Sequence, residues 1–150
     1  TGLFAAPAVS AEARAAVERI LAAVGTTVWI DDEAQMDAVT AVSGSGPAYV
    51  FHFIEALEAA GAQLGFDADT ARALAVGTVL GAAQLAAQSE DSPAQLRERV
   101  TSKGGTTAAA LASFAADDFT AIVARAVLAA EQRGKALGDA LGADGGETNS

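Results

Sequence analysis

Two short segments of the chain place glycines and hydroxyl side chains immediately before a predicted helix. One is Ser-Gly-Ser-Gly-Pro at 43–47, and the other is Thr-Ser-Lys-Gly-Gly-Thr-Thr at 101–107. A helix start offers unpaired backbone N–H groups and the positive end of the helix dipole, which together attract a small anion. Glycine lets a ligand approach the backbone, and hydroxyls add directed donors. The chemistry that this pattern could perform is anion binding.

The sequence around these segments limits which anion they could bind. Neither segment matches a P-loop or a Gly-x-Gly-x-x-Gly fingerprint, and no predicted strand precedes either one. The pattern therefore favours a carboxylate over a nucleotide pyrophosphate. Lys103 would raise the local positive potential in an otherwise acidic chain. Ordinary loop and capping use of the same residues explains the pattern about equally well.

Few other residues offer chemistry. His52 is the only histidine and there is no cysteine, so a metal site is nearly excluded. Because His52 lies between Phe51 and Phe53 in the most apolar segment, we interpret it as a packed or interface residue. The acidic pairs stand where helices should begin, and capping explains them. Glu90 lies in a predicted loop, where a solvated acid is the simpler interpretation.

The composition indicates a helical protein. The chain has 150 residues, a net charge of −10 and 51% hydrophobic residues, of which alanine is the commonest, while only 5% of the chain is aromatic. Alanine favours helices over strands. A pI near 4.3 argues against nucleic-acid and anionic-membrane partners. No run of ~18 apolar residues lacks a charge, glycine or proline, so we expect no membrane span.

Hydrophobic periodicity, helix caps and helix-breaking residues predict an all-α multi-helix bundle domain at 1–141. Ser10 and Gly25 frame the first helix, and a short helical stretch follows Asp31-Asp32-Glu33. Thr26–Ile30, the only β-favouring run, is expected to be an extended connector. Gly142–Ser150 is expected to be a disordered tail. The segment at 43–47 is expected to break the helical pattern completely, with Pro47 opening the next helix. The remaining helices are predicted at 48–64, 70–88, 94–100, 106–116 and 119–141. Asp67 or Asp69 and Ser92 are candidate caps, and Gly61 and Gly65 are candidate helix ends.

Two of these predicted helices carry features that suggest contacts with another chain. The helix at 48–64 is apolar on nearly every side, which predicts burial all round. Gly77 and Gly81 lie four residues apart on one face of the next helix, where missing side chains let another backbone approach. We therefore expect an obligate dimer.

The residues at 37–51 and 96–107, Asp-Ala-Val-Thr-Ala-Val-Ser-Gly-Ser-Gly-Pro-Ala-Tyr-Val-Phe and Leu-Arg followed by Val-Thr-Ser-Lys-Gly-Gly-Thr-Thr, resemble the signatures of pyrroline-5-carboxylate reductase. The likeness runs from about Thr1 to Gly138 and covers only the C-terminal, all-helical half of that enzyme. Its N-terminal Rossmann domain, which carries the glycine-rich dinucleotide fingerprint, is expected to be absent. The chain opens on Thr1 without a signal-like segment, and we expect it to be part of a longer cytoplasmic protein.

The resemblance implies an enzyme that reduces 1-pyrroline-5-carboxylate to L-proline with NADPH or NADH, the cofactor being bound mainly by the absent domain. It also implies an intertwined homodimer of the 6-phosphogluconate dehydrogenase C-terminal type, often assembled into a ring of dimers. By the same likeness, the substrate carboxylate is held by Ser102, Gly104, Gly105 and Thr106, and Thr107 hydrogen-bonds the ring nitrogen as the catalytic residue. Glu90 aligns with an acid near the substrate.

One departure from the family pattern is visible, because many members have proline where this chain has Lys103.

Two alternatives to this function stay open. One is a helical module that only oligomerises, with no bound small molecule. The other is the helical domain of a different Rossmann-linked dehydrogenase, although such domains typically place a catalytic lysine within a helix, whereas Lys103 lies in a predicted loop and Lys135 near the tail.

Overall fold

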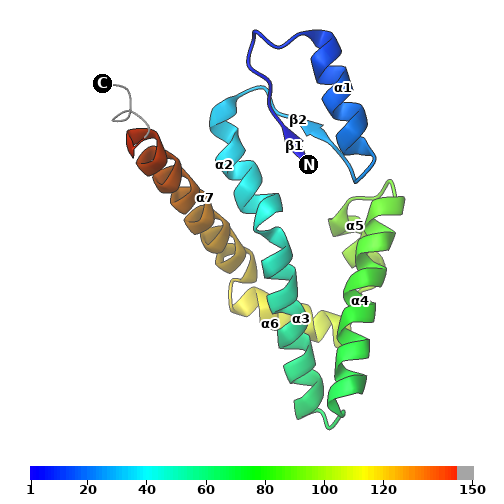
Figure 1. The fold of residues 1–150 in the computed structure, drawn as a ribbon. Helices are drawn as coiled ribbons and strands as arrows, with labels where there is room; N and C mark the ends of the chain where they lie inside the picture. The colour runs from blue at the N-terminus through cyan, green and yellow to red at the C-terminus, as the bar shows by residue number, and fades with distance from the viewer. Residues whose placement is uncertain (145–150) are drawn as a thin grey trace. The chain divides into compact units, whose positions relative to one another are not determined.

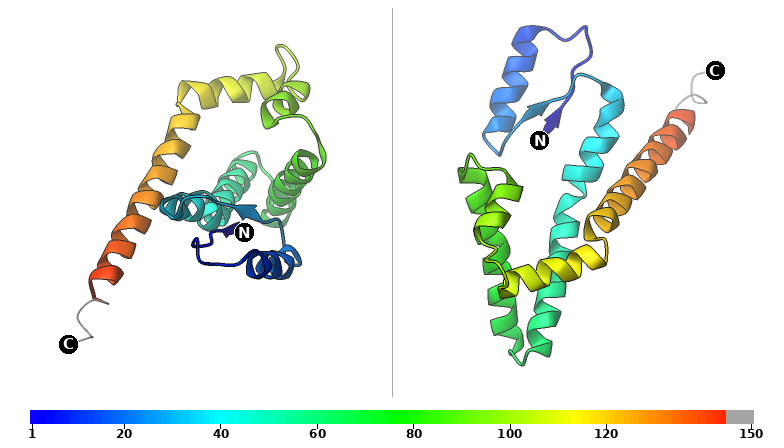
Figure 2. Two further views of the ribbon diagram at one scale, coloured as in Figure 1. Left: turned by 90° about the horizontal axis from the view of Figure 1, so that it is seen from above. Right: turned by 180° about the vertical axis from the view of Figure 1, so that it is seen from behind.

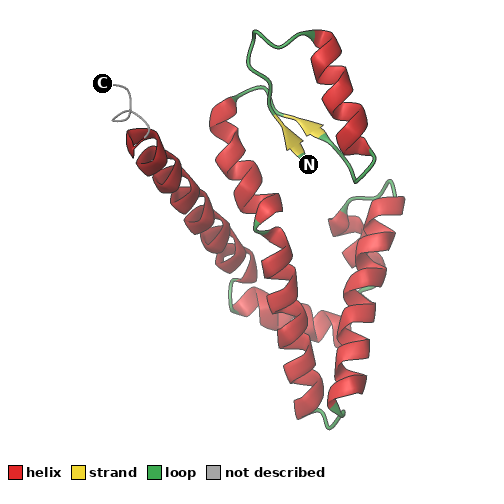
Figure 3. Cartoon of the chain, viewed as in Figure 1, coloured by secondary structure: helices red, strands yellow, loops and turns green. Residues whose placement is uncertain are grey.

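The computed structural model describes residues 1–144, with side chains described through residue 141, and consists almost wholly of helices (Figure 3). The chain forms two compact units. Of the described residues, one unit contains 1–47 and 124–144, and the other contains 48–123. The predicted all-helical class is confirmed. Figure 1 shows the order of the elements along the chain.

The first unit begins with a strand–helix–strand arrangement. Strand β1 (Gly2–Leu3) pairs in parallel with β2 (Val28–Trp29), and helix α1 (Ala11–Ala22) connects them. The expectation that 26–30 forms only a connector was therefore wrong. Its partner strand β1 consists of one glycine and one leucine, which is too short to be recognised as a strand in the sequence. Arg14 of α1 stacks on the Trp29 ring, 4.4 Å from its centroid.

Helix α1 follows its local signals. The Ser10 side chain caps it by accepting from the Ala13 N–H at 3.3 Å, and Gly25 beyond its end has φ +152°. The same unit then continues through η1 (Glu33–Gln35, a 3-10 turn), α2 (Met36–Val39) and η2 (Thr40–Gly44). The short helical stretch that the sequence predicted thus changes pitch twice.

Helix α7 (Phe119–Asp144) carries the chain into the first unit from residue 124 onward. It runs three residues past the predicted end, and the rest of the predicted tail, 145–150, lies outside the described residues. A Cβ at Gly134 would lie 2.9 Å from the Asp37 Oδ1, so a larger residue there would require the Asp37 side chain to move. Lys135 and Glu131 form an ion pair at 2.8 Å on α7, which raises the pKa of Lys135.

The second unit contains most of α3 (Gly46–Gln63), together with α4 (Ala68–Gln88), α5 (Pro93–Arg99) and α6 (Thr106–Ala116). Helices α3 and α4 are joined by a turn in which Gly65 has φ +96°, and the right-hand view of Figure 2 shows them diverging from it. Near the turn a Cβ at Gly61 would lie 3.1 Å from that of Ala71. The close backbone contact within the chain is therefore at Gly61, which the sequence suggested only as a helix end.

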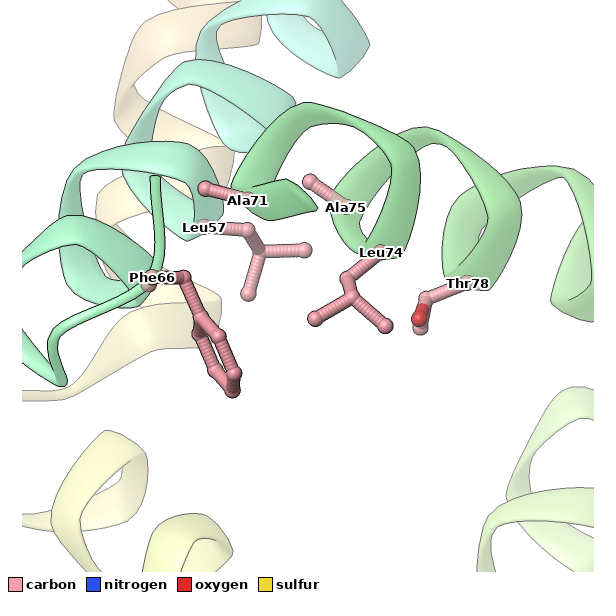
Figure 4. A pocket seen from close by; sticks show the side chains of 7 residues that line it. Leu57, Phe66, Ala71, Leu74, Ala75 and Thr78 are labelled. Atoms are coloured by element: carbon pink, nitrogen blue, oxygen red, sulfur yellow. The ribbon is translucent and has the colours of Figure 1, made fainter. Parts of the chain in front are cut away.

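A shallow apolar hollow lies where these two helices meet (Figure 4). Ala71 and Ala75 are its buried members, at 3% and 4% exposure. The other labelled side chains around it are Leu57, Phe66, Leu74 and Thr78. The small side chains of α4 let α3 come close, and the larger ones are left partly open.

The apolar surface of α3 and α4 is not covered within the chain. Phe51 is 63% exposed and Leu80 is 55% exposed, and no α3 residue is buried. Among the described residues, nothing lies within 4 Å of a Cβ placed at Gly77 or at Gly81. The expected burial of α3 and the close approach at these glycines are thus absent from a single chain. They stay predictions for contacts with a second chain.

The length of α4 raises the question of a membrane span. It has 21 residues and a mean hydropathy of 1.2 over its most apolar 18-residue window, of which 11% is buried, so by length and composition alone it could cross a bilayer. A helix that packs against another protein chain meets the same test, and Asp69, Arg72, Gly77 and Gly81 interrupt its apolar sequence. This feature is therefore weak evidence for a membrane protein.

Candidate carboxylate-binding site

The loop between α5 and α6 is a tight turn with glycine at two adjacent positions. The Gly105 N–H donates to the Ser102 carbonyl at 3.0 Å, which closes the turn. Gly104 has φ +73°, the left-handed region that L side chains rarely adopt. A Cβ at Gly105 would overlap the Ser102 Oγ. Glycine at 104 is therefore favoured by the backbone conformation, and glycine at 105 by the lack of space for a side chain.

The turn leads directly into the uncapped start of α6. Gly105 is its N-cap residue, in extended conformation, and no side chain accepts from the first turn. By contrast, α1, α4 and α5 are capped by Ser10, Asp67 and Ser92. The first helical hydrogen bond of α6 is donated by the Ala109 N–H to the Gly105 carbonyl, at 3.2 Å. The first-turn N–H groups are thus available to a ligand, with the positive end of the helix dipole behind them.

Three hydroxyls surround this helix start. Thr107 is half-buried in the first turn of α6, whereas Ser102 and Thr106 are exposed. Thr101 differs, because its Oγ1 donates to the Arg97 carbonyl at 2.6 Å and so serves to close the end of α5. Lys103 is exposed at the tip of the turn, where it adds a positive charge. These groups could bind a carboxylate through backbone N–H donors, hydroxyl donors and one mobile cation.

Glu90 lies in the loop between α4 and α5, as predicted, and is exposed. The seven-residue helix α5 separates it from the turn at 102–105, and no hydrogen bond joins Glu90 to that turn in the described part of the chain. The sequence-predicted residues Ser102, Gly104, Gly105, Thr106 and Thr107 are contiguous at one site. Glu90 lies at the opposite end of α5.

The segment at 43–47 does not form a second site of the same kind. The helix continues through it as the π-helix η2, with Ser45 N–H donating to the Thr40 carbonyl at 2.8 Å, and α3 begins at Gly46. Pro47 occupies the first turn of α3, close to its predicted place. The prediction of a complete break was wrong, because glycine and serine here permit a widened helical turn.

The remaining titratable residues do not form a metal site. Within the described residues no group of three or more histidine, cysteine, aspartate or glutamate side chains could hold a metal ion. The exposed His52 Nδ1 lies 3.3 Å from the Glu55 Oε2, one turn along α3. The expected packing of His52 is therefore not present within one chain.

These features define a class of protein: an all-helical domain with uncovered apolar helices and a glycine turn that leads into an uncapped helix start. The match to a family model specifies it further, since residues 33–137 fit the model described as pyrroline-5-carboxylate reductase dimerisation. The chain belongs to the pyrroline-5-carboxylate reductase family.

Individual relatives agree with this assignment. The chain is 52% identical to the pyrroline-5-carboxylate reductase of Pseudomonas aeruginosa over 142 residues, 95% of this chain and 52% of that protein. It is 45% identical to that of Haemophilus influenzae, over 91% of this chain and 51% of that protein. The chain thus spans about half the length of the curated relatives it matches.

Solved structures match the fold as well. A pyrroline-5-carboxylate reductase from Coxiella burnetii matches with a TM-score of 0.88 and 43% identity, over 91% of this chain and 50% of that one. The pyrroline carboxylate reductase of Plasmodium falciparum, solved with NADP bound, matches with a TM-score of 0.81 and 33% identity, over 91% of this chain and 53% of that one.

Proposed function

We propose that this chain is the dimerisation and substrate-binding part of an enzyme that reduces 1-pyrroline-5-carboxylate to L-proline with NADPH or NADH. The observation that supports this most is the uncapped start of α6 behind the Gly104–Gly105 turn, in a chain that belongs to the reductase family. The substrate carries one carboxylate, which is the anion that this turn suits by chemistry.

In this proposal each loop residue has one task. The backbone N–H of Thr106 and the Ser102 hydroxyl hold the carboxylate, while Gly104 and Gly105 form the turn that presents them. Thr107 is the catalytic residue, because its hydroxyl hydrogen-bonds the ring nitrogen as that nitrogen becomes an amine. A threonine hydroxyl is too weak an acid to give up its proton outright. Thr107 therefore orients and polarises the nitrogen, and water or the protonated substrate supplies the proton.

The residues of this chain do not fit a complete dinucleotide site. The connection from β1 into α1 reads Phe-Ala-Ala-Pro-Ala-Val-Ser at 4–10, without the glycines that let a backbone approach a pyrophosphate. We therefore place most of the cofactor's binding in the part of the enzyme that this chain does not cover. The fragment alone should not reduce the substrate.

The β1–α1–β2 arrangement supports a division of the chain at about residue 31. Parallel strands are stable when both faces of a sheet are covered, and two strands of two residues are too few to provide this. The family model also begins only at residue 33. We propose that residues 1–30 belong to a larger α/β sheet and that the helical domain follows them. This moves the start of the helical domain from the residue 1 predicted above.

The partner that the uncovered helices support is a second copy of the chain. The family model is named for dimerisation, and α3 and α4 expose apolar side chains that a stable monomer would bury. An intertwined homodimer, assembled further into a ring of dimers, is the form we propose, in the cytoplasm. A module that only oligomerises would have no use for an uncapped helix start behind a glycine turn.

The test is a fusion of this chain to the part of the P. aeruginosa reductase that it does not cover, assayed for substrate-dependent NADPH oxidation. The fusion should turn over, and Thr107→Ala should lower kcat about 10–1000-fold, the range of a lost oriented donor. Thr107→Ser should retain much more activity. A folded, dimeric fusion without turnover would contradict the function, and wild-type kcat in Thr107→Ala would remove the catalytic role.

A further inference from the structure

The loop that carries Glu90 is tied to the far end of α5 by an ion pair. Arg99, the last residue of α5, donates from Nη2 to the Asp91 Oδ1 at 3.1 Å, and its Nη1 contacts the other carboxylate oxygen. Both terminal nitrogens of the guanidinium therefore bind the carboxylate. This paired geometry fixes the orientation of the two side chains as well as their separation. Asp91 is 22% exposed and Arg99 is 67% exposed.

Asp91 is itself held in place by the residue before Glu90. The Asp91 N–H donates to the Ser89 Oγ at 3.1 Å, and the Ser89 hydroxyl donates to the Asp91 Oδ2 at 3.3 Å. Glu90 lies between these two residues and makes no contact of its own among those described. Its backbone position is thus set by the bonds on either side of it.

Helix α5 is fixed at both ends by further bonds. At its start Ser92 and Gln95 form a capping box, with the Ser92 N–H donating to the Gln95 Oε1 at 2.8 Å. At its end Thr101 Oγ1 bonds the Arg97 carbonyl. A seven-residue helix is too short to be stable by propensity, so these side-chain bonds determine where it begins and ends.

We propose that the Asp91–Arg99 pair is a positioning device for the substrate turn. It joins the residue beside Glu90 to the residue two positions before Thr101, and so fixes both segments that flank α5 with respect to one another. Ser102–Thr107 then starts from a fixed anchor, which keeps its N–H groups in the binding arrangement before the carboxylate arrives. Asp91 and Arg99 touch no substrate in this view and act through the turn.

This inference rests on the proposed function, because it assumes that the turn binds the substrate carboxylate. Loss of the pair should leave the turn in its binding arrangement for only a fraction of the time, and the apparent affinity falls by that fraction. Arg99 is mostly exposed, so removal of its side chain should change affinity more than global stability.

The experiment measures L-proline binding to the whole chain by calorimetry, alongside thermal unfolding and the dimer dissociation constant. Arg99→Ala and Asp91→Ala should each weaken proline binding about three- to tenfold, and the double variant should be no weaker than either single one. Arg99→Lys keeps the charge and loses the fork, so it should recover part of the loss. Unfolding and dimerisation should stay as in the wild type.

A matched control is the Lys135–Glu131 pair on α7, which likewise joins an exposed cation to a carboxylate that is only 24% exposed. Glu131→Gln removes that pair and should leave proline binding unchanged. Wild-type affinity in Arg99→Ala would overturn the positioning role, and so would an equal loss in Glu131→Gln. If the wild-type chain itself binds no proline, the proposed function of the turn fails instead.

Discussion

Gly104 is the position where one added methyl group should most directly separate binding from folding. Its φ of +73° lies in the left-handed region, and nothing lies within 4 Å of a Cβ placed there. The cost of Gly104→Ala is therefore conformational and not steric. Holding an L residue in this region costs about 1–2 kcal/mol. Because the turn is exposed, it can relieve this strain by leaving the binding arrangement.

The loss of affinity follows from that energy. A bias of about 1–2 kcal/mol against the binding arrangement corresponds to about a 5- to 30-fold weaker apparent affinity for L-proline. The assay is calorimetric titration of the chain with L-proline, together with thermal unfolding. We expect the affinity to fall and the midpoint of unfolding to move little.

Gly65 supplies the matched control. It also has a positive φ, of +96°, and open space around a Cβ, but it lies in the turn between α3 and α4. Gly65→Ala should carry a similar strain, appear as a loss of stability and leave proline affinity unchanged. Wild-type affinity in Gly104→Ala, or equal losses of affinity in both variants, would refute the argument that this turn binds the carboxylate.

Three further predictions concern the helices. Gly61→Ala should gain less stability than Gly138→Ala, since an added Cβ meets Ala71 at 3.1 Å at Gly61, whereas nothing lies within 4 Å of one at Gly138 on α7. A gain in helix propensity of up to about 1 kcal/mol is common to both, and thermal unfolding compares them. If Gly77→Leu leaves the dimer constant unchanged, the predicted approach of a second chain at Gly77 is wrong; sedimentation at micromolar concentration should show no stable monomer. Bonds from the Thr70 N–H and hydroxyl lower the pKa of Asp67 below 3.8, so its contribution to stability is present above that value and lost as the pH falls through the folded pKa. Asp67→Ala should therefore lower the unfolding midpoint at pH 7, and lower it less as the pH falls toward the folded pKa.

The helices could be predicted because their end signals are local. Ser10, Asp67 and Ser92 cap helices as expected, and α6 occupies its predicted range of 106–116. These features depend on a hydroxyl or carboxylate reaching an N–H three residues away. A single sequence contains all the atoms that such a bond requires.

The missed features depend on partners distant in the chain. The β1–β2 pairing joins residues 26 positions apart, and two-residue strands leave no hydrophobic period to detect. Gly61 was interpreted as a helix end because its reason, the approach of Ala71, lies on another helix. The bond between Asp91 and Arg99 crosses eight residues and a capped helix. The turn at 102–107 needs no partner elsewhere in the chain, and it could be predicted from the sequence.

The proposed function depends above all on the turn and the start of α6 binding the carboxylate of the substrate and product. The most direct measurement is the amide NMR spectrum of the chain titrated with L-proline. We predict saturable shifts of the amides of Gly104, Gly105, Thr106 and Thr107, while those of Gly77 and Gly81 stay unchanged. An absence of saturable shifts at 104–107, or shifts spread evenly over the helices, would contradict it.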